Sequence, residues 1–273
     1  MKKKRRFTKV ICLILAVLLT GVWIYSNFTI HTVEAELSSK KADEEIRVAL
    51  ISDLHLAFYT DCDKIIEMVS ETKPDVIFML GDMYSRRQTG RIGRVIDFAE
   101  RLSEIADVYA VTGDHDYDEE YKQKLDSLEK VFLLDYEFRD VNIKGNKLRI
   151  YGIDNVYFTD TFDLSNEFET LPNDRINILL SHIPSMPHYG DFGFDYIFCG
   201  DTHGGMIRLP ILGSIYFNGY IFPEITYHGI VTDKGLYEFG DTNLYVTSGI
   251  GHFPIPLRFN CRPEICLIKI KGE

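Results

Sequence analysis

Aspartate and histidine residues follow five segments that the sequence predicts to be strands, each just beyond the last apolar residue of its strand. An aspartate at a strand end is usually a helix cap or a turn former, and a lone histidine is usually structural. The carboxyl ends of strands in an open α/β sheet, however, line a single crevice in which ligands bind. Five such motifs therefore predict one shared site, built from Asp53-Leu54-His55, Gly81-Asp82, Gly113-Asp114-His115-Asp116, Ser181-His182 and Gly200-Asp201-Thr202-His203.

The residue types in these motifs indicate a metal site. Carboxylates that share a crevice repel one another unless a cation lies among them, and mixed oxygen and nitrogen ligands suit a divalent metal ion. Asp53 and His55 are two residues apart, as are Asp201 and His203, so each pair points to the same side of extended backbone. The glycines beside them allow the backbone to bend. We therefore predict metal binding at this edge.

The elements that position these residues follow an alternating pattern. Continuous apolar strands are predicted at Ile46–Ile51, Val76–Leu80 and Val108–Val111. Between them, apolar residues recur at helical spacing from Cys62 to Val69 and from Ile92 to Leu102, and a third helix is predicted at 119–128. This order predicts a parallel sheet covered on both faces. Further strands are predicted at 148–153, 176–180, 196–199 and 244–246, which gives one domain, roughly 45–271, of two β-rich halves with helices outside.

In order and spacing, these motifs resemble those of the calcineurin-like metallophosphoesterases: D-x-H, G-D, G-(N/D)-H-D, a lone H, and G-x-T-H-G-G. The tail, with YVTSGIG at 245–251, PLRF at 256–259 and RPEI at 262–265, is similar to the membrane-anchored bacterial branch. That branch includes enzymes acting on UDP-diacylglucosamine and on phospholipid-like phosphoesters. The resemblance implies a four-layer α/β sandwich, in which two mixed β-sheets are flanked by helices.

The resemblance also implies two divalent metal ions that share Asp82 as a bridging ligand. Site one would use Asp53, His55, Asp82 and His203, and site two would use Asp82, Asp114, His182 and Asp201. The chain departs from the family at two of these positions, because the family has Asn at 114 and His at 201. With four carboxylates in place of two, we expect Mn²⁺ or Mg²⁺ in site two, while Zn²⁺ or Fe is compatible with site one.

The implied reaction is hydrolysis of a phosphodiester, phosphomonoester or pyrophosphate by a hydroxide that bridges the two metal ions. His115 would stabilise the transition state or protonate the leaving oxygen, and Asp116 would orient His115. Arg86 and Arg87 are candidates for binding the phosphate, although a solvated loop pair explains them equally well. The other histidines are predicted to be structural: His31, His188, His228 and His252.

Two other functions compete with an enzyme. The first is a catalytically degenerate metal-binding scaffold or ligand-binding domain, in which the aspartates at 114 and 201 have altered site two. Retention of His115 favours the enzyme, because a scaffold has no structural need for an exposed histidine there. The second is a nucleotide-binding domain without metal, which is disfavoured because no P-loop or G-x-G-x-x-G motif follows the strands.

The N-terminus combines a basic tail at 1–9 with an apolar run, VICLILAVLLTGVWIY, that begins at Val10. A core helix would show a polar face, which this run lacks. A cleaved signal peptide would use Val33 and Ala35, which lie some ten residues beyond the run. We predict an uncleaved transmembrane anchor at 10–30 and a linker at 31–45, followed by the phosphoesterase domain at 46–271. The positive-inside rule then predicts a single-pass protein of the cell membrane, with the N-terminus cytoplasmic and the domain extracytoplasmic.

Charge and cysteine content narrow the class of partner. The chain of 273 residues carries a formal charge of −11, and the N-terminal cluster holds six of its 30 cations. The body therefore has 24 cations against 41 acids, and a surface of this kind repels nucleic acid. The five cysteines read as buried apolar residues, and Cys261 and Cys266 lack the spacing of a zinc site. We predict a phosphoester substrate, plausibly lipid-linked, no nucleic acid, and no obligate protein partner.

Overall fold

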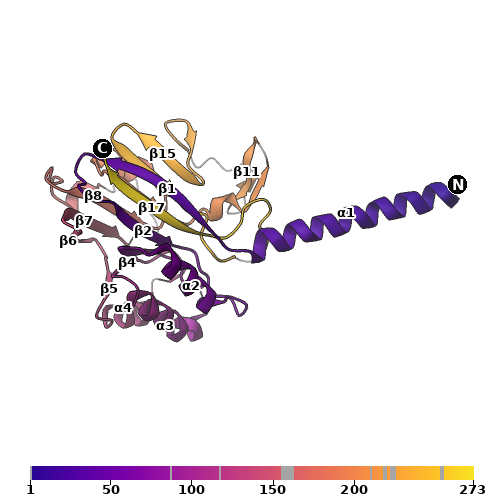
Figure 1. Ribbon diagram of the computed structural model, residues 1–273, viewed down its shortest axis with the longest axis horizontal. Coiled ribbons are helices and arrows are strands. Elements are labelled where there is room, and N and C mark those ends of the chain that lie inside the picture. Colours follow the sequence, from indigo (N-terminus) through magenta and orange to yellow (C-terminus); the bar gives the residue numbers. More distant parts are fainter. Residues whose placement is uncertain are drawn as a thin grey trace.

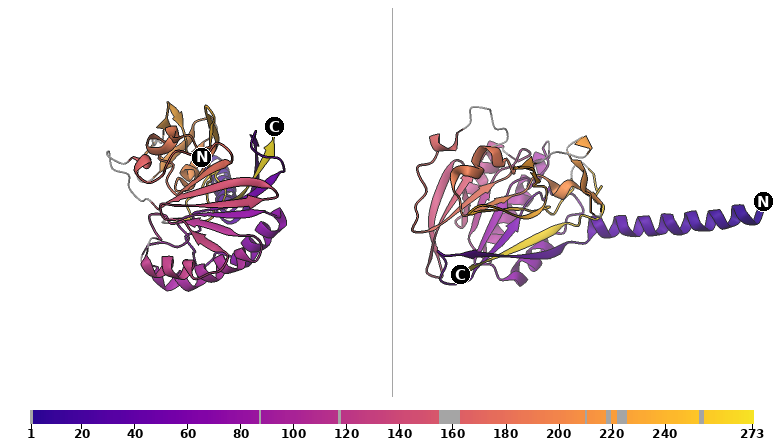
Figure 2. Two further views of the ribbon diagram at one scale, coloured as in Figure 1. Left: turned by 90° about the vertical axis from the view of Figure 1, so that its left-hand side faces the viewer. Right: turned by 90° about the horizontal axis from the view of Figure 1, so that it is seen from above.

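Two six-stranded mixed sheets packed face to face form the body of the protein, and the N-terminal helix projects from it (Figures 1 and 2). This architecture comes from a computed structural model, which describes residues 2–86, 88–116, 118–154, 163–209, 211–217, 220–221, 226–252 and 255–273. The sandwich of two mixed sheets flanked by helices agrees with the predicted fold class.

The first sheet has the strand order β1-β17-β2-β3-β4-β5. Its four strands β2 to β5 are parallel, β17 is antiparallel to β2, and β1 pairs in parallel with β17. The strand bounds are β1 (His31–Ser39), β2 (Ile46–Ile51), β3 (Val76–Leu80), β4 (Val108–Val111), β5 (Val131–Leu133) and β17 (Glu264–Gly272).

The second sheet has the order β15-β16-β9-β8-β7-β6, with four parallel strands from β16 to β7 and an antiparallel strand at each edge. Its bounds are β6 (Glu137–Ile143), β7 (Asn146–Ile153), β8 (Ile176–Ser181), β9 (Tyr196–Cys199), β15 (Gly235–Phe239) and β16 (Thr242–Val246). Two small ribbons lie beside it, formed by β10 (Ile207–Leu209), β11 (Gly213–Phe217), β12 (Tyr220–Ile221), β13 (Thr226–Tyr227) and β14 (Ile230–Val231).

Three apolar clusters hold the layers together. The central cluster lies between the sheets and contains residues of both, such as Phe78 of β3 and Phe198 of β9, whose ring centroids are 5.8 Å apart. A second cluster packs the outer face of the first sheet against α2 (Cys62–Thr72), α3 (Ile92–Ser103) and α4 (Glu119–Asp126). The third lies on the outer face of the second sheet, under α5 (Met186–Tyr189) and the three-residue turn η2 (Leu164–Asn166). Buried apolar area of this extent is the main stabilising contribution to the fold.

Local sequence explains the ends of the helix that follows the first strand. The carboxylate of Asp61 accepts a hydrogen bond from the backbone N–H of Lys64 at 3.1 Å and so caps α2. The helix ends at Lys73 in a left-handed conformation (φ 48°), directly before Pro74. Short 3-10 turns complete the connections at η1 (Thr89–Arg91), η3 (Gly190–Phe192) and η4 (His203–Gly205).

The segment predicted as a linker at 31–45 is in large part a strand. Its first nine residues form β1, which pairs with β17 along its whole length from His31–Glu264 to Ser39–Gly272. Side chains that point outward make ion pairs across this edge, between Glu34 and Lys269 and between Glu36 and Lys271. The alternation of polar and apolar residues in HTVEAELSS is typical of a strand. Its charged residues led to the prediction of a linker instead.

The N-terminal helix α1 (Lys2–Phe28) is long and apolar enough to cross a membrane, and its residues from Arg5 to Tyr25 are exposed. Its last turn, by contrast, belongs to the domain. Ser26 and Asn27 are almost fully buried, with 2% and 1% exposure, although the sequence analysis counted them with the anchor. The five cysteines are unpaired, and Cys261 and Cys266 are both buried.

Candidate metal centre

The predicted Asp and His motifs of both sheets meet at one edge of the sandwich. Backbone pairing continues past the ends of β2 and β3, because Asp53 N–H donates to Gly81 O at 3.0 Å and His55 N–H to Asp82 O at 2.9 Å. The loop after β9 joins them across the sheets, where the backbone N–H of Asp201 donates to Asp53 Oδ1 at 3.2 Å.

Five of the seven predicted ligands have a left-handed backbone, which is unfavourable for residues other than glycine. Their φ angles lie between 42° and 65°, at Asp53, His55, Asp82, Asp201 and His203. Such strain costs about 1–3 kcal/mol per residue and concentrates at functional sites. Here it turns alternate side chains toward the same crevice.

Two glycines allow the aspartates to approach neighbouring loops. A Cβ atom at Gly113 would lie 2.2 Å from Asp82 Oδ1, and one at Gly200 would lie 2.6 Å from Asp53 Oδ2. Neither position has room for a larger residue without displacing a carboxylate.

The first group of side chains matches the set predicted for site one. Nε2 of His203 lies 3.1 Å from Nε2 of His55 and 3.7 Å from Oδ1 of Asp53. Nε2 of His55 lies 3.4 Å from Oδ2 of Asp82. Two imidazole nitrogens and two carboxylates therefore face one small volume, which is the donor set of a borderline divalent cation.

The second group matches the set predicted for site two and is centred on His182. Its Nε2 lies 3.5 Å from Asp82 Oδ2, 3.8 Å from Asp114 Oδ1 and 3.9 Å from Asp201 Oδ1. Asp82 thus stands between the two groups, with the same oxygen near His55 and near His182.

The unpaired atoms of this cluster fit bound cations. Among the described residues, the buried atoms Asp53 Oδ2 and His182 Nε2 have no hydrogen-bond partner. The other ring nitrogen of His182, Nδ1, lies 2.7 Å from the carbonyl of Leu80, which accepts its proton and leaves Nε2 free to act as a ligand. Buried polar atoms rarely lack partners in native proteins, so both atoms point to a missing ligand.

Charge in the cluster is unbalanced without a cation. Burial raises the pKa of Asp53, raises that of Asp82 well above its usual value, and raises that of Asp201 to about 7. Burial alone would lower the pKa of His182, but the carboxylates of Asp82, Asp53 and Asp201 outweigh it and hold that pKa well above its usual value. In the metal-free protein a proton therefore takes the place of a cation among the carboxylates.

The imidazole of His115 lies at the edge of the cluster, between two partners. The backbone N–H of Arg86 donates to its Nδ1 at 3.0 Å, and its Nε2 faces Asp114 Oδ2 at 3.9 Å. Burial lowers the pKa of His115, so its ring is neutral near pH 7. Its backbone N–H donates to Asp82 Oδ1 at 2.9 Å, which ties the position of the ring to the central carboxylate.

The carboxylate of Asp116 bonds to the backbone of two neighbouring turns. Its two oxygens accept backbone N–H groups at 2.6 Å, from Gly113 and from Met83, and its side chain is fully buried. It therefore joins the turn after β4 to the turn after β3. Asp116 fixes the loop that carries His115, whereas Arg86 and Asp114 contact the ring itself.

Arg86 is exposed beside His115, so its side chain belongs to the rim of the crevice. Arg87, the other residue predicted to bind phosphate, lies outside the described residues.

Sequence reasoning missed one residue that supports the cluster, Arg258. Its side chain is fully buried, and its Nη2 lies 2.7 Å from the carbonyl of Ser248, 2.8 Å from that of Gly251 and 3.3 Å from His203 Nδ1. The only sequence signal was its place in the PLRF motif, to which no role could be given.

Comparison with known proteins defines the class of this protein. The model of the calcineurin-like phosphoesterase family matches residues 46–205, and the chain belongs to this family. It is 27% identical to the uncharacterized metallophosphoesterase YkuE of Bacillus subtilis, over 89% of this chain and 85% of the relative. It is 26% identical to the phosphodiesterase YaeI of Escherichia coli, over 82% of each chain. It is 24% identical to the UDP-2,3-diacylglucosamine pyrophosphatase LpxG of Chlamydia muridarum, over 84% of each. The protein is thus a hydrolytic phosphoesterase of a family that depends on two metal ions.

Proposed function

We propose that the protein is a membrane-anchored phosphoesterase that holds two divalent cations and hydrolyses a phosphodiester or pyrophosphate at the membrane surface. The observation that carries the proposal is the convergence of seven ligand-type side chains, two of them with buried unpaired atoms directed into the cluster. When bound, the two cations polarise a water molecule and the phosphoryl oxygens, which supplies the nucleophile and the charge neutralisation.

The chain's own residues hold and orient these components. Site one would use Asp53, His55, Asp82 and His203, and site two would use Asp82, Asp114, His182 and Asp201. Because Arg86 N–H occupies Nδ1 of the neutral His115 ring, the ring proton is on Nε2. His115 would be a proton donor in a hydrogen bond, stabilising the negative charge on the leaving oxygen while the proton stays on the ring. Arg86, on the rim, attracts the phosphate anion, and we extend this role to Arg87.

The additional carboxylates at 114 and 201 set the choice of metal. Four aspartates balance two dications formally, and oxygen-rich ligand sets suit Mn²⁺ or Mg²⁺ better than Zn²⁺. We therefore propose Mn²⁺ or Mg²⁺ in site two, with Zn²⁺ or Fe compatible with the two-histidine site one.

The membrane role rests on the N-terminal helix and on how it joins the domain. We propose that α1 anchors the protein, with the basic residues at 1–9 in the cytoplasm and the domain outside. Cleavage at Ala35 would cut through β1, which is fully paired with β17, so the structure favours an uncleaved anchor. One relative, LpxG, is a UDP-2,3-diacylglucosamine pyrophosphatase. Because the anchor would also hold this enzyme at the membrane, we propose a lipid-linked substrate.

The decisive experiment uses the full chain in detergent, stripped of metal and refilled with Mn²⁺, Mg²⁺ or Zn²⁺. Hydrolysis of bis-p-nitrophenyl phosphate and p-nitrophenyl phosphate is measured together with bound metal per chain. His115→Ala tests the proton donor. His188→Ala, which alters a partly buried histidine outside the cluster, is the matched control.

We expect turnover that requires metal, two bound ions, and loss of activity in His115→Ala alone. If the chain binds one ion or none and hydrolyses neither compound with any metal, it is not an enzyme of this kind. It would then be the degenerate scaffold, with site two altered by the aspartates at 114 and 201. Equal activity of the His115 and His188 variants would exclude the assigned proton donor.

A further inference from the structure

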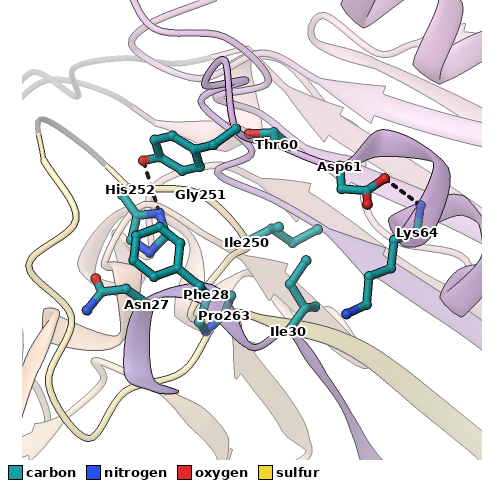
Figure 3. A pocket seen from close by; sticks show the side chains of 11 residues that line it. Asn27, Phe28, Ile30, Thr60, Asp61, Lys64, Ile250, Gly251, His252 and Pro263 are labelled. Carbon is teal, nitrogen blue, oxygen red and sulfur yellow. Dashed lines mark hydrogen bonds between the residues drawn. The ribbon is translucent and has the colours of Figure 1, made fainter. Parts of the chain in front are cut away.

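A cavity of about 180 Å³ lies where the end of α1 meets the phosphoesterase domain (Figure 3). Three parts of the chain surround it: the end of α1 with the residues before β1, the turn that leads into α2, and the loop after β16. The lining residues that matter here are Phe28, Ile30, Tyr59, Lys64, Ile250 and His252. None of them is a ligand candidate, so the cavity is separate from the metal centre.

The cavity nevertheless adjoins the metal centre through the backbone. Its floor includes Gly251, whose N–H donates to the carbonyl of Asp53 at 2.6 Å. The carbonyl of Gly251 accepts from Arg258, which in turn contacts His203. Two successive hydrogen-bonded contacts therefore link the wall of the cavity to ligand candidates of the metal centre.

The size and walls of the cavity suit an alkyl chain. Phe28, Ile30 and Ile250 project toward its interior in Figure 3, and Ile250 is 3% exposed. A cavity of roughly 150 Å³ with apolar walls accepts a molecule as large as benzene. This one therefore has room for a short run of methylene groups.

One polar group in the cavity wall lacks a partner. His252 is 8% exposed, and within the described part of the chain its Nε2 has no hydrogen-bond partner. Burial lowers the pKa of His252 to about 3, so its imidazole is neutral near pH 7. The hydroxyl of Tyr59 lies 3.5 Å from Nδ1. In the tautomer in which Nδ1 accepts from this hydroxyl, the ring proton is on Nε2. The wall thus presents one buried N–H donor, which calls for an uncharged acceptor oxygen.

The mouth of the cavity lies at the level where α1 leaves the domain. Three aromatic rings gather there, with centroid separations of 5.7 Å between Phe28 and Tyr59 and 5.1 Å between Phe58 and Tyr59. Phe58 is 85% exposed, so its ring adds to the exposed aromatic surface beside Tyr59. Aromatic residues at the end of an apolar helix are typical of the membrane–water interface.

We propose that this cavity binds one acyl chain of an ester-linked phospholipid substrate, with the ester carbonyl accepting a hydrogen bond from His252 Nε2. The inference rests on the proposed function and specifies its substrate class. A chain entering from the bilayer past Phe28 places its apolar part against Ile30 and Ile250 and its carbonyl at Nε2 of His252. The phosphate end of the same molecule remains free to reach the metal centre.

The first test measures hydrolysis of acyl glycerol p-nitrophenyl phosphodiesters, with acyl chains of two to twelve carbons, by the full metal-loaded chain in detergent. We expect kcat/KM to rise by up to about fourfold for each methylene that enters the cavity, equivalent to about 0.8 kcal/mol, and then to level off. Ile30→Phe fills part of the cavity and flattens this rise, whereas the matched control Ile230→Phe, at an exposed site on β14, keeps it. An unchanged chain-length dependence in Ile30→Phe would overturn the proposal.

The second test concerns the hydrogen bond. The wild-type protein should prefer the ester over the ether-linked analogue of equal length by roughly threefold to tenfold, the range of one neutral hydrogen bond. His252→Phe keeps a ring of similar shape but removes the donor, and should abolish this preference. The same preference in His252→Phe and in the wild type would exclude the assigned contact.

A third measurement does not depend on catalysis. Trp23 is the single tryptophan, and its ring lies 5.5 Å from that of Phe28 at the cavity mouth. A brominated acyl phospholipid should quench its fluorescence more strongly in the wild type than in Ile30→Phe, and equal quenching would count against the site. If neither bis-p-nitrophenyl phosphate nor any lipid is hydrolysed, the proposed function fails, but this quenching difference still tests the cavity.

Discussion

Asn27, at the end of α1, should contribute a large share of the stability of the domain. Its Nδ2 donates to the carbonyl of Arg258 at 2.7 Å, and its Oδ1 accepts the N–H of Arg258 at 2.8 Å. Asn27→Ala leaves both of these buried backbone groups without a partner, and each orphaned group costs about 1–3 kcal/mol. We expect a loss of about 3 kcal/mol in the free energy of unfolding.

The assay is thermal denaturation of the full chain in detergent, followed by circular dichroism. For a domain of this size, a loss of about 3 kcal/mol lowers Tm by roughly 6–12 °C. Asn142→Ala is the matched control, because Asn142 also bonds to both backbone groups of one residue, Gly145, but does so in an exposed turn. We expect that control to change the free energy of unfolding by less than about 1 kcal/mol.

Equal Tm values for the two variants would refute the reasoning. Such a result would mean that the end of α1 moves freely relative to the loop that holds Arg258. The domain would then be only tethered by its helix, and the burial of Asn27 would have no energetic consequence.

The other predictions concern the site and the edge of the first sheet. His115→Ala should lower kcat roughly 10²–10³-fold with unchanged metal content, and a loss below tenfold would contradict the hydrogen bond to the leaving oxygen. Asp114→Asn combined with Asp201→His should raise the affinity for Zn²⁺ relative to Mn²⁺ in chelator competition, and an unchanged ratio would disprove the charge argument. Because burial raises the pKa of Asp201 to about 7, its protonated form stabilises the metal-free fold, and this contribution is lost as pH rises from about 4 to about 7. The Tm of Asp201→Asn, relative to the Tm of the wild type, should therefore rise between about pH 4 and about pH 7. A Tm difference that stays constant over this pH range would argue against the raised pKa of Asp201. A fragment that starts at Glu45 lacks β1 and should melt below one that starts at Ser26, which keeps it; coincident melting curves would show that β1 is dispensable.

Much of the site was predictable because its residues follow apolar strands directly. The strand bounds predicted at 46–51, 76–80, 108–111 and 196–199 agree with the structure. The ends of parallel strands must share an edge, and this rule placed Asp53, Asp82 and Asp114 together without any coordinates. Their spacing also carried the family resemblance, which the family model bears out.

The roles of Asp116 and Arg258 required the tertiary structure. From sequence, Asp116 stands one residue from His115, and nothing there indicates that Gly113 and Met83 would donate to its oxygens. Arg258 reads as an ordinary surface cation, yet carbonyl groups of a loop around it make its burial possible.

What the sequence by itself determined is local: apolar periodicity, strand ends and the residue types that bind metal. The sequence could not show that Asn27, inside an apolar run, would bond to a residue 231 positions away. Nor could it show that 31–39, whose alternating pattern is that of a strand, would pair with β17 at the edge of the first sheet. Both depend on contacts between the two ends of the chain, and such contacts arise only when β17 brings the C-terminus beside β1. Local pattern fixes which element a segment forms, but only packing decides which distant segment it meets.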